Sequence, residues 1–208
     1  MIWDTIANIP LAQLLTFIAG GLVINIAPGQ DVFFASACGI QGGPRAGMLA
    51  GIGVGFGVLF HVTLATIGLG ALVAAHPEAL RAIKYTGAAY LLWLAWNAWH
   101  AGPVDSHSRG SVQTWNILRR GAMSNILNPK PVLFLLAFLP QFTKLEYGPI
   151  WQQTLSLGLI FAFFGTVATV AYGLVAGYAG QLLVRRMGVV NKIAAVMFAG
   201  LAVRLVAK

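Results

Sequence analysis

Two long stretches of this chain carry no charged side chain at all. They cover residues 46–75 and 150–183, which makes them 30 and 34 residues long. A helix that crosses the hydrocarbon core of a bilayer needs about 20 consecutive, mostly apolar residues. Each stretch is therefore long enough to span a membrane, a pattern that is typical of an integral membrane protein and not of a soluble domain.

The composition agrees with this interpretation. The chain has 208 residues, of which 58% are hydrophobic and 9% are charged, and its mean hydropathy is +0.79. Soluble domains contain about 25% charged residues. The net charge of +8 comes mostly from basic residues that lie between apolar runs, which indicates contact with lipid head groups. The lipid bilayer is thus an expected partner, and nucleic acid is not, because no basic patch is interleaved with aromatic residues.

We expect an all-α, polytopic membrane protein with one transmembrane domain over residues 1–208. The turn predicted at residues 39–45 and the polar linker predicted at residues 101–120 separate apolar runs. The linker would divide a first repeat (about 1–100) from a second (about 121–208). Six transmembrane helices are expected, at residues 11–38, 46–75, 85–99, 121–142, 150–183 and 188–206.

The first apolar run is expected to be a retained span. A secretory signal peptide begins with a basic segment, whereas the only charge before Asp31 is the acid Asp4. The chain also has a single cysteine, Cys38. One cysteine excludes an intramolecular disulfide and a metal site built from several cysteines.

A short motif occurs twice, one hundred residues apart. Residues 25–31 read NIAPGQD, and residues 125–131 read NILNPKP. A second match, with an offset of 103, pairs TLATIGLG at residues 63–70 with TVATVAYG at residues 166–173. Because each half holds three expected spans, an odd number, the second half enters the membrane from the opposite side. The sequence therefore predicts inverted repeats, related by a pseudo-twofold axis in the membrane plane.

Both copies of the motif contain residues that break helices. The breaks are predicted at Pro28 and Gly29 in the first span and at Pro129 and Pro131 in the fourth. In hydrocarbon, a broken helix frees backbone groups, so breaks are tolerated where they are buried in protein or line a wet cavity. Matching breaks in two halves of a membrane protein are a sequence indicator of a transporter's binding site.

Each break also carries one buried charge. Asp31 is the only acid inside an expected span, and Lys130 is the only base deep between apolar runs. A charge near the bilayer centre costs about 2.5–3.5 kcal/mol on insertion scales, so both need a reason. Gln30 aligns with Lys130 across the repeat, and the fold should therefore bring the two charges to one central region. A pathway role is the leading hypothesis, with a structural ion pair, or a cap and a snorkelling base, as the alternative.

The breaks resemble the starts of new helices. Asn128 can cap free N–H groups, and Pro129 suits the first helical position. Asp31 would lie in the first turn of its own helix, where the dipole favours a carboxylate. Two such N-termini can bind a substrate carboxylate, while Asp31 holds an ammonium group or a proton. The candidate substrate-binding or proton-binding residues are Asp31, Lys130, Asn128, Asn25, Gln30 and Asn125. His61 is either a proton relay or a buried packing residue.

The chain also resembles a known family. The motif at residues 25–31, the glycines of residues 39–55, residues 86–91 (TGAAYL) and residues 121–142 with their NPK and LPQF segments occur in the order and spacing of the LysE/RhtB family of bacterial amino-acid exporters. The likeness covers nearly the whole chain. The family's usual Pro-Gly-Pro-Asp is here Pro28, Gly29, Gln30 and Asp31, so the acid is kept and one proline is missing.

The resemblance implies a multi-pass exporter of the bacterial inner membrane. Its cargo would be small amino acids or derivatives, such as homoserine, threonine, lysine, arginine or homoserine lactones. Export would be driven by proton antiport, so no cofactor is expected besides the proton motive force. The resemblance also implies a homodimer, for which Gly47, Gly51 and Gly55 would offer a close helix interface.

The sequence argues against two other classes of protein. A membrane-embedded enzyme would need a nucleophile with a base or clustered metal ligands, and the expected spans hold one histidine, one aspartate and no cysteine pair. A divalent-cation transporter would need several carboxylates or histidines in the membrane, and Lys130 would repel the ion. The sequence therefore favours neither an enzyme nor a bound metal.

The distribution of basic residues predicts the orientation. Seven lie on one side of the expected spans: Arg45, Arg109, Arg119, Arg120, Arg185, Arg186 and Lys192. Five lie on the other side: Arg81, Lys84, Lys144, Arg204 and Lys208. Because basic loops stay in the cytoplasm, both termini are expected to be periplasmic.

Overall fold

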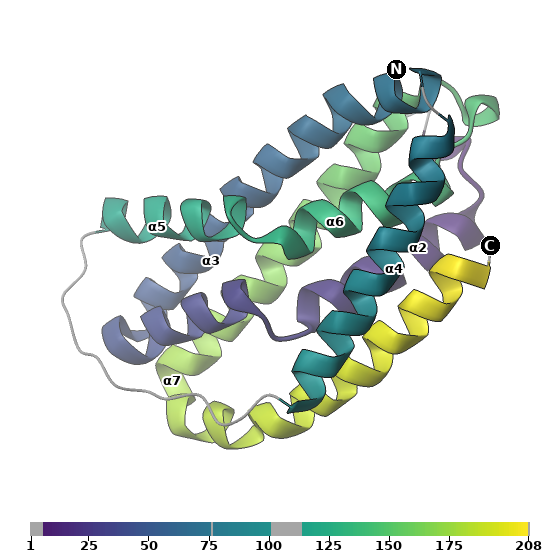
Figure 1. Cartoon of the computed structure of the whole chain (residues 1–208). Helices are drawn as coiled ribbons and strands as arrows, with labels where there is room; N and C mark the ends of the chain where they lie inside the picture. Colours follow the sequence, from purple (N-terminus) through teal and green to yellow (C-terminus); the bar gives the residue numbers. More distant parts are fainter. Residues whose placement is uncertain (1–5, 76, 101–113, 208) are drawn as a thin grey trace.

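The computed structural model describes residues 6–75, 77–100 and 114–207, and these residues form helices and no strand. The expected all-α fold is confirmed. The helices are α2 (Leu11–Ile26), α3 (Gln30–Ala75), α4 (Pro77–His100), α5 (Thr114–Ile126), α6 (Pro129–Phe138) and α7 (Ile150–Ala207), with 3-10 turns at Leu139–Phe142 and Leu145–Tyr147. Figure 1 shows an elongated bundle in which both ends of the described chain lie near the loop that joins α6 to α7.

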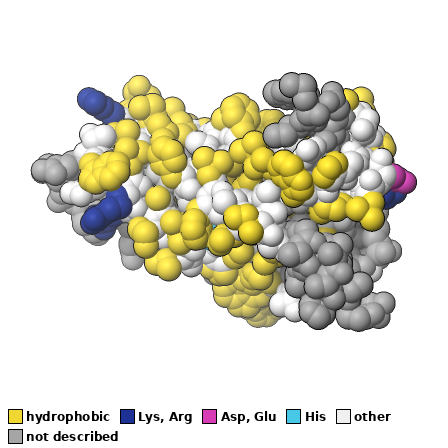
Figure 2. Space-filling view, turned by 90° about the horizontal axis from the view of Figure 1, so that it is seen from above, with side chains coloured by type: hydrophobic (Ala, Val, Ile, Leu, Met, Phe, Trp, Pro, Cys, Tyr) yellow, Lys and Arg dark blue, Asp and Glu magenta, His cyan; other side chains and the backbone are white. Residues whose placement is uncertain are grey.

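The outer surface of the bundle suits a membrane. Within the described part of the chain, two helices are long and apolar enough to cross a bilayer, at Gln30–Gly68 and Ile150–Ala179, and α5 with the segment that follows it makes a third, bent candidate. In Figure 2, hydrophobic side chains are spread over the visible flank, and the coloured charged side chains lie at the two ends, with Lys or Arg at both and an acidic side chain at the right-hand end. The count of six spans stays a prediction.

Two of the helices are kinked. The helix α3 continues through most of the turn predicted at residues 39–45, so that turn is reduced to one non-helical residue, Gly43. Its φ of 78° favours glycine, and Pro44 follows it. The second kink lies at Ala179 of α7, with φ −136° and ψ 38°. Each long helix therefore consists of two straight parts that run in different directions.

Two predicted boundaries were wrong. Residues 114–120 belong to α5 and are not linker, while residues 101–113 lie outside the described part of the chain. The third expected span, residues 85–99, is the C-terminal part of the longer α4, which begins at Pro77. Proline is well tolerated in the first turn of a helix, where its missing N–H is no loss.

Three glycines of α3, spaced every fourth residue, lie against α7: Gly47, Gly51 and Gly55. A Cβ atom on Gly47 would collide with the backbone of Gly173, and one on Gly173 would collide with the backbone of Gly47. A Cβ on Gly51 would lie 2.6 Å from the nitrogen of Val170. The glycines thus allow two antiparallel helices of the same chain to touch, and they are not free to form the dimer interface suggested by their spacing.

Candidate functional site

The two breaks are present where the motif occurs twice. The first separates Ile26, the last residue of α2, from Gln30, the first residue of α3. The second separates α5 from α6, whose axes differ by 49°. Asn128 is the N-cap of α6, with its Oδ1 accepting a hydrogen bond of 3.0 Å from the backbone N–H of Lys130. The fourth span therefore restarts as the Asn-Pro sequence predicts.

The carboxylate of Asp31 links the two breaks. Its Oδ2 accepts hydrogen bonds from Nδ2 of Asn125 at 2.9 Å and from Nδ2 of Asn128 at 3.0 Å. Its Oδ1 is buried and has no hydrogen-bond partner. An unsatisfied buried oxygen of this kind costs free energy, so a donor from a bound molecule would find a vacant acceptor here.

The ammonium group of Lys130 has a different partner. Its Nζ donates a 2.7 Å hydrogen bond to the carbonyl oxygen of Ala27 and lies 5.7 Å from the ring centroid of Phe198. Gly29 leaves room for the side chain of Lys130 next to the backbone of the first break, because a Cβ at position 29 would lie 3.3 Å from Nζ. No salt bridge joins Lys130 to Asp31, although both are described. The two charges therefore form no direct ion pair in this structure.

Three further hydrogen bonds hold the first break against the second half of the chain. Nε2 of Gln30 donates to the carbonyl oxygen of Ser124 at 3.0 Å and to its Oγ at 3.1 Å. The hydroxyl of Tyr172 donates to the carbonyl oxygen of Ile26 at 3.0 Å. Backbone carbonyls next to the two breaks are thus satisfied, that of Ile26 by a side chain of α7 and that of Ser124 by a side chain of α3, as an interruption in hydrocarbon requires.

The two asparagines of the repeated motif also lie against neighbouring helices. Nδ2 of Asn25 donates to the carbonyl oxygen of Phe161 at 3.2 Å. The backbone carbonyl of Asn125 lies 3.0 Å from Nε2 of His61, which must carry the proton because a carbonyl only accepts. Nδ1 of His61 is buried without a partner. His61 thus contacts the backbone of Asn125, and the side chain of Asn125 in turn contacts Asp31.

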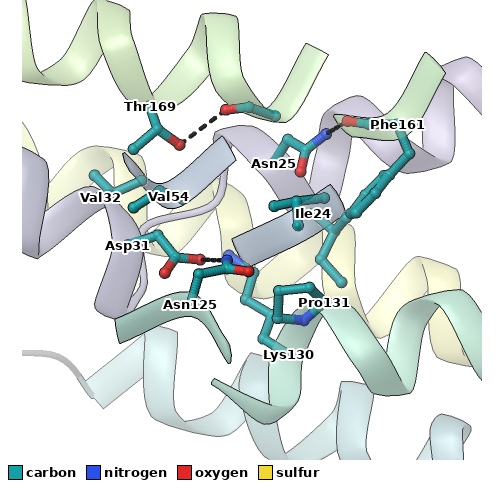
Figure 3. Close-up of a pocket in the computed structure, with 12 residues that line it drawn as sticks. Ile24, Asn25, Asp31, Val32, Val54, Asn125, Lys130, Pro131, Phe161 and Thr169 are labelled. Atoms are coloured by element: carbon teal, nitrogen blue, oxygen red, sulfur yellow. Dashed lines mark hydrogen bonds between the residues drawn. The ribbon is translucent and has the colours of Figure 1, made fainter. Parts of the chain in front are cut away.

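A pocket lies between the breaks (Figure 3). Its polar lining comes from Asn25, Asp31, Asn125, Lys130 and Thr169. Its other lining residues are mostly apolar: Ile24, Val32, Val54, Val58, Pro131, Phe161 and Gly165. The free space suits roughly one water molecule, so a larger ligand can enter only if the walls move apart.

The structure brings four of the six candidate binding residues to the pocket, namely Asp31, Lys130, Asn25 and Asn125. Asn128 contacts the pocket through its bond to Asp31. Gln30 and His61 do not line the pocket. Gln30 is exposed and contacts Ser124, while His61 is buried and contacts the pocket residue Asn125. Of the break residues, Pro131 lines the pocket, while Pro28 and Gly29 lie in the gap between α2 and α3.

The sequence interpretation missed two polar contacts at this site, from Ser124 and Tyr172. The sequence does contain a signal for Tyr172. At the offset of 103 residues it aligns with Leu69, so a hydroxyl group stands where the first repeat has an apolar side chain. Ser124 directly precedes the second motif but carries no comparable signal. Among the described residues there is no group of three or more His, Cys, Asp or Glu side chains that could hold a metal ion.

Comparison of the chain with known protein families finds a match to one family. The family model described as "LysE type translocator" matches residues 22–208, which includes both breaks and every pocket residue. No solved structure matches the chain.

Individual relatives agree with this family. An uncharacterized membrane protein of Vibrio cholerae is 32% identical over 91% of this chain and 92% of its own length. A homoserine/homoserine lactone efflux protein of Salmonella typhi is 34% identical over 71% of this chain and 70% of its own length. A leucine efflux protein of Klebsiella pneumoniae is 33% identical over 65% of this chain and 66% of its own length.

Proposed function

Because the chain belongs to the LysE family of translocators, we propose that it exports small amino acids or their derivatives across the bacterial inner membrane. The names of its relatives support this cargo, since they include efflux proteins for homoserine, homoserine lactone and leucine. We further propose that export is secondary active transport by proton antiport. The pocket between the two helix breaks would be the site that alternates between the two sides of the membrane.

One observation carries the proposal. Within one pocket, a carboxylate with a vacant oxygen and an ammonium group lie near each other without forming a salt bridge. Two buried charges that do not satisfy each other are costly in a membrane protein. A zwitterion offers the missing partners, because its ammonium group suits Asp31 and its carboxylate suits Lys130.

The remaining pocket lining suits a small cargo. In this proposal Oδ1 of Asp31 accepts a hydrogen bond from the amino group, and the amides of Asn25 and Asn125 contact its polar edges. The valines at positions 32, 54 and 58 would face a short aliphatic or hydroxylated side chain. Lys130 would exchange the carbonyl of Ala27 for the carboxylate of the cargo, which frees a backbone group at the break.

Proton coupling would follow from competition at Asp31. A carboxylate that has taken up a proton no longer attracts an ammonium group, so one site cannot hold both ions. Proton binding from the periplasmic side would release the cargo there, and loss of the proton to the cytoplasm would prepare the site for the next molecule. Neither a metal ion nor an organic cofactor is needed for this cycle.

The test is a transport assay in everted membrane vesicles. Vesicles with the protein receive labelled homoserine, threonine, leucine, lysine and homoserine lactone, with and without an inside-acid pH gradient. We expect gradient-dependent accumulation of at least one of these compounds. Vesicles with equal amounts of the Asp31→Asn protein serve as the control. Equal accumulation in vesicles without the protein would contradict the proposed function.

A further inference from the structure

A cluster of phenylalanine rings lies between the pocket and one end of the bundle. Phe17 of α2 contacts three rings of the α6 segment, with centroid distances of 6.5 Å to Phe134, 6.4 Å to Phe138 and 5.3 Å to Phe142. All four side chains are at most 3% exposed. The cluster begins at the pocket itself, because the pocket residue Phe161 stacks on Phe134 at 5.0 Å.

The cluster is tightly packed. A Cβ atom on Gly20 would lie 2.6 Å from the ring of Phe138, so this ring rests directly on the backbone of α2. The cluster ends at Phe142, two residues before Lys144, whose ammonium group forms an exposed salt bridge of 3.1 Å with Glu146. The ring contacts therefore run from the pocket residue Phe161 to Phe142, at the start of the loop that joins α6 to α7.

The repeat allows a direct comparison with the opposite end. At the offset of one hundred residues that aligns the two motifs, the four rings correspond to Ile117, Phe34, Cys38 and Gly42. Only one of these four residues is aromatic. The side chain of Cys38 is half-buried, and Gly42 is exposed.

The contact between Gly20 and Phe138 has its own counterpart. The equivalent positions hold Arg120 and Cys38. A cationic side chain and a small thiol thus stand where the other end has a glycine and a ring. Arg45, Arg119 and Arg120 are exposed at this end. Figure 2 shows basic side chains without an acidic neighbour at the left-hand end, whereas the basic side chain at the right-hand end lies beside an acidic one.

We propose that Phe17, Phe134, Phe138 and Phe142 form a gate that closes the pocket toward the α6–α7 loop, and that cargo reaches the pocket from the arginine-rich end, past Cys38. This inference rests on the proposed function, since it takes the pocket as the cargo site. Basic residues stay on the cytoplasmic side, so the route past Cys38 begins in the cytoplasm and the ring cluster faces the periplasm.

The chemistry of the rings suits a seal. Aromatic side chains that pack without voids leave no path for water, and an ion or zwitterion cannot cross a dry apolar layer at low cost. A closed ring cluster therefore prevents protons and cargo from leaking while the pocket faces the cytoplasm. On the opposite route the apolar cluster is smaller and contains one ring: Ala35, Ala46, Ala50 and Ile117 are buried, with Phe34, Cys38 and Leu49 packed against them.

The gate can be tested by labelling one cysteine in the pocket. The background is Cys38→Ala, and Thr169→Cys places a thiol in the pocket lining. A membrane-impermeant maleimide is applied to right-side-out and to inside-out vesicles. We expect labelling in inside-out vesicles, whose outer face is the cytoplasmic one, and no labelling in right-side-out vesicles.

Two substitutions then change the two routes separately. Phe138→Ala opens the ring cluster, so labelling from the periplasmic face should appear. Phe163→Ala is the matched control, because that ring is 64% exposed on the outside of α7, and it should leave the labelling unchanged. Cys38→Phe in place of Cys38→Ala adds a ring on the other route and should reduce cytoplasmic labelling. This last variant decides the question if Phe138→Ala does not fold.

The proposal is overturned if the intact protein is labelled equally from both faces, or if neither Phe138→Ala nor Cys38→Phe alters the pattern in folded protein. The labelling needs no transport. If the expected labelling is seen but none of the tested compounds accumulates, the gate is supported and the proposed function is contradicted. If a compound accumulates but the expected labelling is absent, only the gate is contradicted.

Discussion

Asn125 donates a 2.9 Å hydrogen bond to the carboxylate of Asp31, and this bond joins the asparagine of the second motif to the acid of the first. Asn128 adds a second bond to the same carboxylate oxygen. The two breaks are therefore parts of one site. The other carboxylate oxygen faces no donor, which leaves the site ready for a proton or an ammonium group.

Asp31→Asn should abolish export driven by a pH gradient while the protein still inserts in the membrane. The amide has nearly the shape of the carboxylate but can neither carry a proton nor attract an ammonium group. Uptake into everted vesicles, normalised to the amount of protein in the membrane, measures the effect. Normal export by a well-expressed variant would remove Asp31 from the mechanism.

Asn128 should be needed for stability and for function in separable ways. Asn128→Ala removes the N-cap of α6, which costs about 1 kcal/mol, and a hydrogen bond to a charged group, which contributes about 1.5–3 kcal/mol. Asn128→Asp keeps a capping oxygen but places a second negative charge beside Asp31. The unfolding temperature in detergent should therefore fall further in the alanine variant, which has lost the cap, than in Asn128→Asp. Both variants should lose transport. An active Asn128→Asp protein would contradict this assignment.

Some of this site follows from the sequence alone. The Asn-Pro pair predicts the restart at Pro129, and the repeat predicts that Asp31 and Lys130 lie near each other; both line one pocket. The partners of the two charges do not follow. Lys130 reaches the carbonyl of Ala27 only because the first break leaves that oxygen free to accept a hydrogen bond. The sequence does not show which backbone oxygen lies within reach of the ammonium group.

Lys130→Met should destabilise the folded protein because it leaves the carbonyl of Ala27, a buried residue, without its donor. An unsatisfied buried acceptor costs about 1–3 kcal/mol. Lys144→Met is the matched control, since Lys144 is exposed and its salt bridge is at the surface. Thermal unfolding of the purified proteins gives the comparison. If both variants unfold at the same temperature as the original protein, the hydrogen bond to Ala27 contributes nothing to stability.

Gly47→Ala should prevent tight packing of α3 on α7, because the added carbon would meet the backbone of Gly173. Gly200→Ala is the control, since a Cβ there meets nothing within 4 Å. In an open position alanine favours the helix by roughly 0.5–1 kcal/mol. We expect a loss of folded protein for the first variant and an unchanged or higher unfolding temperature for the second. Equal behaviour of the two would show that the close contact is not required.

The same glycines show where sequence reasoning stops. A spacing of four residues predicts a close helix contact but not the helix that makes it. The contact turns out to be internal, and the partners of Gly47, Gly51 and Gly55 are Gly173, Val170 and Thr166 of α7. Gly177, four residues after Gly173, lies instead against Gly43 and Pro44. The kink at Gly43 was expected as a longer turn, since the sequence does not reveal how many residues a change of direction needs.

The most direct test of the central claim is whether cargo protects the pocket. In the Cys38→Ala, Thr169→Cys protein, the rate of maleimide labelling is measured with increasing concentrations of the compound that accumulates best in the vesicle assay. Labelling at an exposed loop position, Glu146→Cys, serves as the reference. We expect the compound to slow labelling at position 169 in a saturable way and to leave the labelling at position 146 unchanged. Unchanged labelling at position 169, in protein that transports the compound, would place the cargo site elsewhere.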